Sequence, residues 1–332
     1  MIDVISFGDM VVDFLPERAG RIRGITNFAK ASGGAPANVA VAVSRLGGRS
    51  SFIGKVGEDE FGYFLRHVLE KEGVDTSGLI HTHDHPTGVA FVQRTESGER
   101  SFLFYREKTA DMSLSCSDID ESLLGTSVIF HFGSNTLIHP DARAATIRAA
   151  TIARERGSIL SFDVNMRFPL WPSEQACIEQ IRLAIPYAHV LKVSFKEMEW
   201  LTHTTDLSKG TACLLEMGPD LILVTRGEKG TYYRTRELSG NVPAYNVNVV
   251  DTTGAGDGFV GGFLRQLTDH VEGRSFEQAI GFEEELREMI RYANAVGALT
   301  TTRMGAVPAL PTKEEVFEFQ YRNRTRKIKA DG

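Results

Sequence analysis

The segment around residue 254 combines residues that can bind an anion with a residue that can accept a proton. It runs Asp251-Thr252-Thr253-Gly254-Ala255-Gly256-Asp257-Gly258-Phe259 and leads into an apolar stretch typical of a helix. The two glycines let backbone N–H groups converge at the helix N-terminus, where free donors and the helix dipole attract an anion such as phosphate. Asp257 falls in the first turn, where its carboxylate could take the proton of a hydroxyl that attacks the phosphate. On spacing alone, Asp257 could equally cap the helix.

Two common nucleotide-binding patterns do not fit the chain. The third glycine of G-x-G-x-x-G would fall on Phe259, and no G-x-x-x-x-G-K-[ST] loop occurs. A nicotinamide-dependent oxidoreductase is therefore disfavoured. Thr225-Arg226-Gly227-Glu228-Lys229-Gly230 could bring backbone against a nucleotide, although an ordinary turn explains it as well.

Polar residues that suit sugar hydroxyls lie in two segments near the N-terminus. Gly33-Gly34-Ala35-Pro36-Ala37-Asn38 precedes a helix of small residues, and the Asn38 amide can both donate and accept a hydrogen bond. Asp9 and Asp13 follow the first expected strand, at the edge where open α/β sheets bind ligands, and their carboxylates suit vicinal hydroxyls. The ordinary alternatives are a helix cap for Asn38 and turn positions for the two aspartates.

Short apolar runs that alternate with amphipathic stretches must position these residues. The runs predict buried strands, and the expected helices end at glycines, as helix C-termini commonly do. This alternation predicts an α/β fold with a mostly parallel sheet covered by helices on both faces. The expected strands are Val4–Phe7, Ser51–Gly54, Val128–Phe132, Ile159–Phe162, Val190–Val193 and Leu221–Val224, and the expected helices include Ala37–Leu46, Phe61–Glu72 and Asp141–Arg156.

Two segments interrupt the alternation, because they are typical of strands but have no helix between them. Met10–Leu15 is one, and Gly88–Arg94 with Ser101–Tyr105 is the other, joined by the turn-rich connector Thr95–Glu99. The second segment is typical of a hairpin. We expect a small antiparallel sheet that projects from the main body and acts as a lid over a cleft or as an oligomer contact.

Composition and charge exclude several classes of protein. The chain has 332 residues with 37 basic and 43 acidic side chains, a net charge of −6, which argues against nucleic-acid binding over a broad surface. No apolar run approaches the roughly 18 residues of a membrane span. Three scattered cysteines and an N-terminus without basic residues favour a cytoplasmic protein.

Taken together, Gly33–Gly48 and Asp251–Gly258 closely resemble the ribokinase-like (PfkB) carbohydrate kinases. The resemblance extends over essentially the whole chain. It implies a single kinase domain, residues 1–332, with a three-layer α/β/α fold and a lid sheet formed by about residues 10–32 and 86–107, which in this family often pairs two subunits into a homodimer. Four further segments are most similar to fructokinases, namely Phe52–Gly62, Phe104–Arg106, Ala110–Met112 and Asp163–Pro172.

The resemblance also implies roles for individual residues. Asp257 matches the catalytic base, and the backbone of Gly254, Ala255 and Gly256 matches the anion hole. The sugar-binding positions are Asp9, Asp13, Gly33, Gly34, Asn38, Phe104, Arg106 and Arg167. The ATP-binding positions are Thr225, Gly227, Gly230, Gly256 and Asn294, the last near adenine.

Two metal sites follow from the same resemblance. Glu197 matches the glutamate of an N-x-x-E motif that organises Mg²⁺ through water, although Ser194 stands here in place of the asparagine. Positions that bind a monovalent cation such as K⁺ in many members correspond to Asp251, Thr253, Arg303 and Gly305, mostly through backbone carbonyls, while a hydroxyl ligand of some relatives falls on Ala309.

The implied activity is ATP-dependent phosphorylation of a sugar hydroxyl, most simply O6 of D-fructose. Within the same class, the alternatives are a 2-keto-3-deoxygluconate kinase and a nucleoside or aminoimidazole riboside kinase. A sugar acid would use Arg106 and Arg167 for its carboxylate. The alternative from another class is a non-catalytic sugar-binding regulator, which the intact Asp257 and glycines disfavour.

Overall fold

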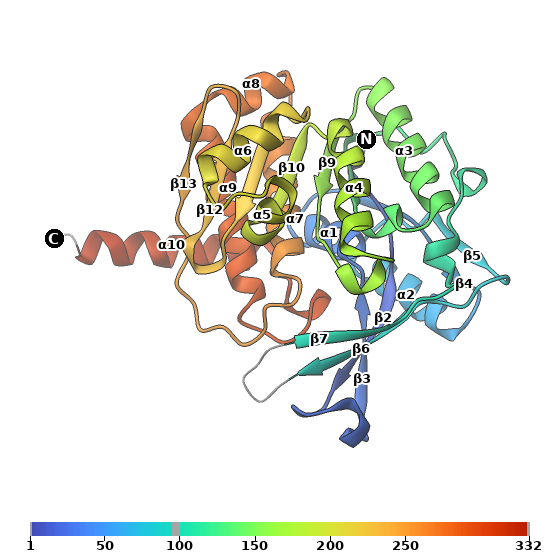
Figure 1. Cartoon of the computed structure of the whole chain (residues 1–332). Helices are drawn as coiled ribbons and strands as arrows, with labels where there is room; N and C mark the ends of the chain where they lie inside the picture. The colour runs from blue at the N-terminus through green and yellow to red at the C-terminus, as the bar shows by residue number, and fades with distance from the viewer. Residues whose placement is uncertain (1, 95–99, 331–332) are drawn as a thin grey trace.

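The computed structural model describes residues 2–94 and 100–330, which form two β-sheets with helices around the larger one (Figure 1). The larger sheet has nine strands in the order β13-β12-β11-β10-β9-β8-β1-β4-β5. Neighbouring strands from β11 to β5 run parallel, whereas β12 and β13 add an antiparallel edge. The bounds are β1 Ile2–Phe7, β4 Ser50–Gly57, β5 Leu79–Thr82, β8 Ser127–Gly133, β9 Ile159–Asp163, β10 Val190–Ser194, β11 Leu221–Thr225, β12 Thr231–Arg234 and β13 Ser239–Val242.

Helices cover both faces of this sheet, as the alternation of elements predicted. The helices α3 to α6 pack on the face turned toward the viewer in Figure 1, and α1, α7, α8 and α9 pack on the other. The bounds are α1 Ala35–Arg45, α2 Glu60–Lys71, α3 Pro140–Glu155, α4 Glu174–Ala184, α5 Phe195–Thr202, α6 Leu207–Glu216, α7 Ala255–His270, α8 Phe276–Gly281, α9 Glu283–Thr300 and α10 Lys313–Ala330.

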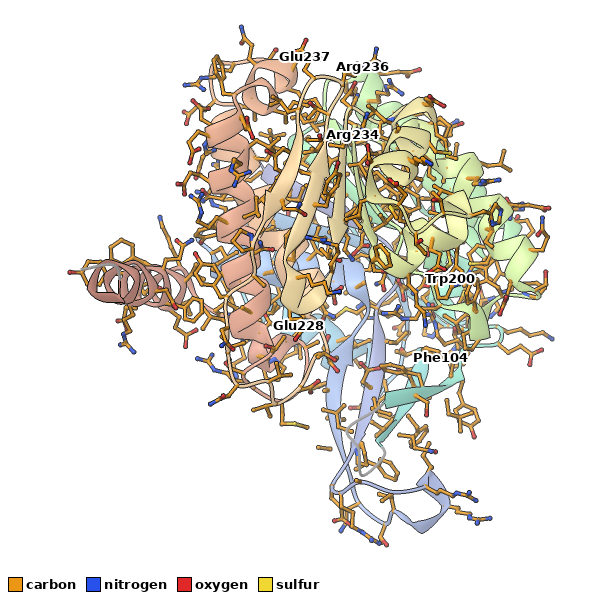
Figure 2. All side chains as sticks on the ribbon, turned by 60° about the vertical axis from the view of Figure 1, so that its left-hand side comes forward. Phe104, Trp200, Glu228, Arg234, Arg236 and Glu237 are labelled. Carbon is orange, nitrogen blue, oxygen red and sulfur yellow. The ribbon has the colours of Figure 1, made fainter. Side chains whose placement is uncertain are left out.

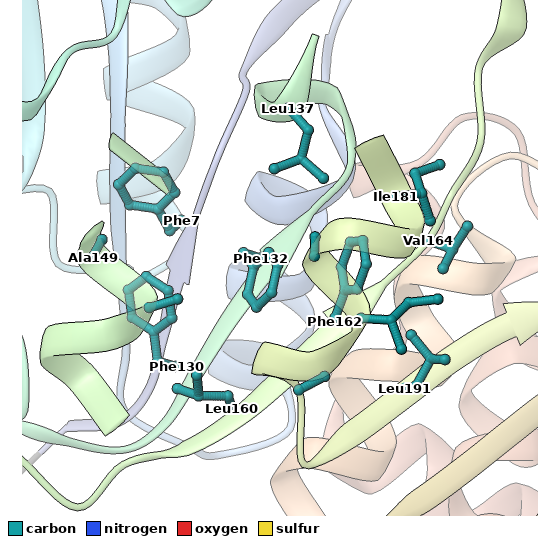
Figure 3. Close-up of a cluster of buried hydrophobic side chains, with 14 of the residues drawn as sticks. Phe7, Phe130, Phe132, Leu137, Ala149, Leu160, Phe162, Val164, Ile181 and Leu191 are labelled. Atoms are coloured by element: carbon teal, nitrogen blue, oxygen red, sulfur yellow. The ribbon is translucent and has the colours of Figure 1, made fainter. Parts of the chain in front are cut away.

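Each central strand contributes side chains to two hydrophobic cores, because successive residues of a strand point to opposite faces. Phe130, Phe132 and Phe162 lie in the core on the α3–α4 side, where the rings of the last two stack with centroids 4.7 Å apart (Figure 3). Ile129 lies in the core on the α7–α9 side. Burial on both faces explains why these strands appear in the sequence as continuous apolar runs.

The smaller sheet projects from the carboxyl ends of the parallel strands, below the main body in Figure 1. We call it the lid sheet. Its strands are β3 Phe28–Gly33, β2 Val11–Pro16, β6 Val89–Arg94 and β7 Arg100–Tyr105, in that order.

The predicted fold class, a mostly parallel sheet with a small separate sheet, is confirmed, with one correction. The lid sheet is not wholly antiparallel, since β2 and β6 pair in parallel. Both strands leave the main body in the same direction, β2 after β1 and β6 after β5, so they run side by side with the same polarity. The predicted connector 95–99 lies outside the described residues. No helix within residues 2–94 and 100–330 is long and apolar enough to cross a membrane.

Candidate active site

A cavity of about 620 Å³ lies between the lid sheet and the carboxyl ends of the parallel strands. It brings together predicted site residues from both halves of the sequence. Those that line it are Asp9, Asp13, Gly34, Asn38, Phe104, Arg106, Arg167, Thr253, Gly254, Gly256 and Asp257. Those that do not line it are Gly33, Glu197, Thr225, Gly227, Gly230, Asp251, Ala255, Asn294, Arg303 and Gly305.

One end of the cavity, which we call the helix end, is formed by the N-terminus of α7 with Gly254, Gly256, Asp257 and Lys192. Gly254 is the N-cap of α7, with a φ of +76° that favours glycine. Asp257, in the first turn, is 9% exposed, and its Oδ2 accepts a hydrogen bond from Asn38 Nδ2 at 2.7 Å. Burial raises the pKa of Asp257 to about 6, while the Asn38 hydrogen bond opposes the rise. Asp257 thus bonds to a side chain of another helix and does not cap the free N–H groups at the start of α7. This favours the proton-acceptor interpretation over the helix cap.

Asn38 holds the Asp257 carboxylate from the neighbouring helix α1. Its Nδ2 donates to Asp257, whereas its buried Oδ1 has no hydrogen-bond partner within the described part of the chain. The N-cap of α1 is Gly34, so Asn38 does not cap that helix. A buried acceptor that lines a cavity is suited to a donor such as a hydroxyl, because leaving it unpaired costs free energy.

The other end, which we call the lid end, holds Asp9, Asp13, Arg106 and Asp111. The Arg106 guanidinium is buried and forms ion pairs with Asp111 and, at 3.1 Å, with Asp9. Burial raises the pKa of Asp13 to about 7, and the neighbouring Arg106 opposes this rise. One cation therefore faces three carboxyl groups at this end.

Glycines let the chain approach the lid end closely. A Cβ atom on Gly33 would collide with the Asp13 carboxylate, and one on Gly34 would collide with the Asp9 carbonyl oxygen. Gly34 also has a φ of +104°. Gly33 thus shapes this end without lining it. From the lid, Phe104 on β7 faces the cavity beside Phe102, with ring centroids 5.6 Å apart (Figure 2).

Arg167 belongs to a loop after β9 that is fastened at several points. Asn165 has a φ of +35°, and its N–H donates to Asp163 Oδ1 at 3.2 Å. The N–H of Met166 donates to Glu197 Oε1 at 2.7 Å. Arg167 lowers the pKa of both Asp13 and Asp257, which places its positive charge within reach of both ends of the cavity.

Ser194 and Glu197 form a capping box at the start of α5. Glu197 Oε2 accepts from Ser194 N at 2.6 Å, and Ser194 Oγ accepts from Glu197 N at 3.3 Å. With Met166 bound to Oε1, both Glu197 oxygens already accept backbone hydrogen bonds. Each oxygen keeps one lone pair, so this carboxylate fits a water-mediated contact with Mg²⁺ better than direct ligation.

The predicted nucleotide-loop residues form the turn between β11 and β12. Gly227 and Gly230 have φ values of +57° and +79°, and Thr225 pairs with Thr231 across the hairpin. Figure 2 shows Glu228 of this turn at the end of the main sheet that faces the lid. The Asn294 amide on α9 accepts from Thr231 Oγ1 and donates to the carbonyls of Val242 and Pro243, so it joins α9 to β12 and β13.

The predicted cation ligands lie just behind the helix end. Asp251 Oδ1 accepts from Thr253 N at 2.8 Å, and Asp251 Oδ2 accepts from Gly305 N at 2.7 Å. The Arg303 side chain pairs with Glu315.

Sequence reasoning missed several polar residues that the fold brings to or beside the cavity. Lys192 is the one charged residue of β10, and its position in a mostly apolar strand was the available signal. Asn135 Nδ2 donates to Asp9 Oδ2 at 3.1 Å, a contact with no trace in either local sequence. Asp111, Asp163 and Asn165 were missed as well.

Known proteins match most of this chain in sequence and in fold. The family described as pfkB family carbohydrate kinase matches residues 1–313. The probable fructokinase-2 of Arabidopsis thaliana is 44% identical over 318 residues, which cover 95% of each chain. The crystal structure of a fructokinase with bound ATP from Xylella fastidiosa has a TM-score of 0.89 at 34% identity, covering 97% of this chain and 99% of that one. A double mutant of the fructokinase from Vibrio cholerae O395, in a form that binds fructose, ADP and a potassium ion, has a TM-score of 0.86 at 36% identity, covering 96% of this chain and 98% of that one.

Proposed function

The chain belongs to the pfkB family of carbohydrate kinases, and on that basis we propose that it transfers the γ-phosphoryl group of ATP to D-fructose. The products are fructose 6-phosphate and ADP. The observation that carries the proposal is the shared cavity, in which Asp257 at the start of a helix faces carboxylates suited to sugar hydroxyls. In this proposal residues 1–332 act as one kinase domain, with residues 10–32 and 86–107 as its lid.

Asp257 acts as the general base. The oxygen of the sugar hydroxyl forms a bond to the γ-phosphorus, the bond from phosphorus to ADP breaks, and the hydroxyl proton passes to Asp257. With a pKa of about 6, the carboxyl is mostly ionised at pH 7 and can accept that proton. The backbone N–H groups of Gly254, Ala255 and Gly256 stabilise the charge that develops on the phosphoryl oxygens.

The lid end favours a neutral sugar over a sugar acid. Asp9, Asp13 and the free Oδ1 of Asn38 are hydrogen-bond acceptors, and acceptors suit hydroxyl groups. The Arg106 charge is already compensated by Asp9 and Asp111, so it is poorly available for a substrate carboxylate. This observation favours fructose over 2-keto-3-deoxygluconate, with Arg167 left for the phosphoryl group and Phe104 packing on the sugar.

The nucleotide lies along the β11–β12 turn in this proposal, with Thr225, Gly227 and Gly230 against ATP and Asn294 supporting the turn beside adenine. Among the described residues, no group of three His, Cys, Asp or Glu side chains could hold a metal ion. We therefore expect Mg²⁺ to be held mainly by phosphates and water, with Glu197 as an outer carboxylate, and to neutralise phosphate charge when bound. Asp251, Thr253, Arg303 and Gly305 would hold K⁺, an ion that the Vibrio cholerae relative binds.

A homodimer through the lid sheet is part of the proposal. The strand β7 is an edge of that sheet, and its Leu103 and Tyr105 side chains are 46% and 58% exposed. An apolar, unpaired edge suits pairing with a second copy. Light scattering should give twice the chain mass, and Leu103→Glu should reduce it to one chain mass.

The test of the function is ADP release in Mg-ATP with D-fructose, 2-keto-3-deoxygluconate and aminoimidazole riboside compared side by side, each with and without K⁺. Rapid turnover on fructose, with little on the other two, supports the proposal. Turnover only on the acid would reassign Arg106 and Arg167 to carboxylate recognition, and turnover only on the riboside would indicate a nucleoside kinase. Sugar binding without ADP release would indicate a non-catalytic regulator.

A further inference from the structure

Lys192 is a buried cation within an apolar strand. The residue is 7% exposed, and its neighbours in β10, Leu191 and Val193, are fully buried core residues. Removing an ammonium group from water costs several kcal/mol, and an apolar side chain would fill such a place at no such cost. The charge at this position therefore calls for an explanation beyond folding.

The Lys192 ammonium lies between a carboxylate and the cavity. Its Nζ is 3.0 Å from Asp163 Oδ1 and 3.2 Å from Oδ2. It also approaches the start of α7 so closely that a Cβ on Gly256 would lie 3.3 Å from Nζ. Both Lys192 and Gly256 line the cavity. Because an ammonium group carries three N–H donors, the Asp163 pair leaves capacity for another acceptor.

The same ammonium acts electrostatically on the base. Lys192 lowers the pKa of Asp257, against the rise caused by burial. The N-terminus of α7 itself offers only partial charges, equivalent to about half an elementary charge. Lys192 is thus a full positive charge next to both the predicted anion hole and the proton acceptor.

We propose that the Lys192 ammonium contacts a non-bridging oxygen of the phosphoryl group during its transfer, and that Asp163 positions this ammonium. The proposal rests on the kinase function proposed above. As the phosphoryl group moves from ADP to the sugar oxygen, the proton goes to Asp257 and Lys192 stays protonated throughout. Lys192 is then a catalytic residue that attracts the developing charge, and Asp163 is a positioning residue.

The competing explanation is that Lys192 only neutralises Asp163. Lys192→Met alone does not distinguish the two explanations, because it leaves the buried Asp163 carboxylate unpaired and destabilises the fold. The double variant Lys192→Met/Asp163→Asn removes both charges, so it does distinguish the two explanations. Lys55→Met/Asp118→Asn is the matched control, because that pair is 2.9 Å apart, partly buried and absent from the cavity lining.

The experiment measures kcat with saturating Mg-ATP and fructose, the melting temperature, and the calorimetric Kd of fructose and of fructose 6-phosphate. For the Lys192 double variant we expect a folded protein whose kcat falls about 10²–10³-fold, the loss typical of removing one group that stabilises transition-state charge. Fructose should bind within about threefold of the unchanged chain, while fructose 6-phosphate should bind about tenfold more weakly. Lys192→Arg, which keeps the charge, should recover part of kcat, and the control pair should stay within about twofold.

The proposal is overturned if the Lys192 double variant keeps kcat within about threefold of the unchanged chain, or if it weakens fructose and fructose 6-phosphate equally. A failure of the fructose assignment is distinguishable, because the unchanged chain would then release ADP only with another sugar. The Lys192 variants and the control pair would then be compared with the sugar that supports ADP release, and that comparison decides the Lys192 proposal. If no sugar supports ADP release by the unchanged chain, the kinase function and the Lys192 proposal both fall.

Discussion

The two ends of the cavity each hold a buried cation among carboxyl groups, but only one end also has the N-terminus of a helix. At the lid end, Arg106 pairs with Asp9 and Asp111 and also faces Asp13, so carboxyl groups outnumber the cation. At the helix end, Lys192 pairs with Asp163 and also faces Glu197 and Asp257, but here the N–H donors at the start of α7 lie beside the cation. Hydroxyl groups need acceptors and phosphoryl groups need donors. The difference between the ends is therefore the helix N-terminus, whose N–H donors would suit a phosphoryl group, whereas the lid end offers mainly acceptors that would suit hydroxyl groups.

The same residue type also behaves differently at the two ends. Burial raises the pKa of Asp13 to about 7 and that of Asp257 to about 6. Asp257 is held lower by the Asn38 hydrogen bond and by Lys192. At pH 7, Asp257 is therefore mostly ionised, as a base must be, whereas Asp13 is divided between its two forms and can donate to a hydroxyl as well as accept from one.

The largest expected effect is at the helix end. Asp257→Asn should lower kcat by about 10³–10⁴-fold, the upper part of the range for general acid–base catalysis, while the Kd of fructose stays within about threefold. Steady-state kinetics and calorimetry measure the two. Asp13→Asn at the lid end is the contrasting variant and should act mainly on fructose affinity. The comparison fails if Asp257→Asn weakens fructose binding and leaves kcat intact.

The next effect tests charge compensation at the lid end. Arg106→Ala leaves Asp9 and Asp111 without their cation, which should lower the free energy of unfolding by about 3 kcal/mol, the lower part of the range for breaking a buried pair. The loss is moderated because the carboxyl groups can take up protons. Urea unfolding at pH 7 measures it, with Arg106→Lys as the control that keeps the charge. An unchanged unfolding free energy for Arg106→Ala would mean that the lid end does not depend on this cation.

A smaller effect follows from the pKa of Asp257. Because the base must be ionised, kcat/KM should fall about tenfold for each pH unit below about 6, rather than below about 4 as for an ordinary aspartate. A pH profile of kcat/KM, which reports the pKa of the free enzyme, measures this limb. Asn38→Ala removes the hydrogen bond that lowers the pKa, so the limb should move to higher pH. A profile that stays flat from pH 7 to pH 5 would contradict the assignment of the base.

The smallest effect concerns the loop between the two ends. Ser194→Ala removes the N-cap of α5 and should cost about 1 kcal/mol of stability, while the two backbone contacts of Glu197 keep the Arg167 loop in place and kcat nearly unchanged. Thermal unfolding and kinetics measure this. Ser173→Ala, which removes the cap of α4, is the matched control. A large loss of kcat in Ser194→Ala alone would mean that the hydroxyl itself supports the site.

Local spacing in the sequence was sufficient to predict much of the fold. The apolar runs predicted the parallel strands, and Gly254 with Gly256 predicted a helix that starts at their position with Asp257 in its first turn. The three expected helices at Ala37–Leu46, Phe61–Glu72 and Asp141–Arg156 begin within two residues of their predicted starts. Strand and helix patterns depend on consecutive residues, so they can be recognised in a single sequence.

The charge partners in the cavity could not be predicted in the same way. Lys192 and Asp163 are 29 positions apart, and Asn135 and Asp9 are 126 apart. Asp111 is only five positions from Arg106, but its pairing with Arg106 and the second pairing with the distant Asp9 depend on the fold, so a sugar acid remained an open alternative at the sequence level. The parallel pairing of β2 with β6 was missed for the same reason, since the direction in which two distant strands leave a sheet is not a local property.

The sequence by itself determined the α/β architecture, the glycine-rich start of α7 and the place of Asp257 in its first turn. Only the tertiary structure decided which carboxyl groups face a cation, which pKa values rise and which buried acceptor is left open to a ligand. The physical reason is that backbone conformation depends on neighbours along the chain, whereas burial and electrostatic interaction depend on distances in space, which only the packing of the whole chain sets.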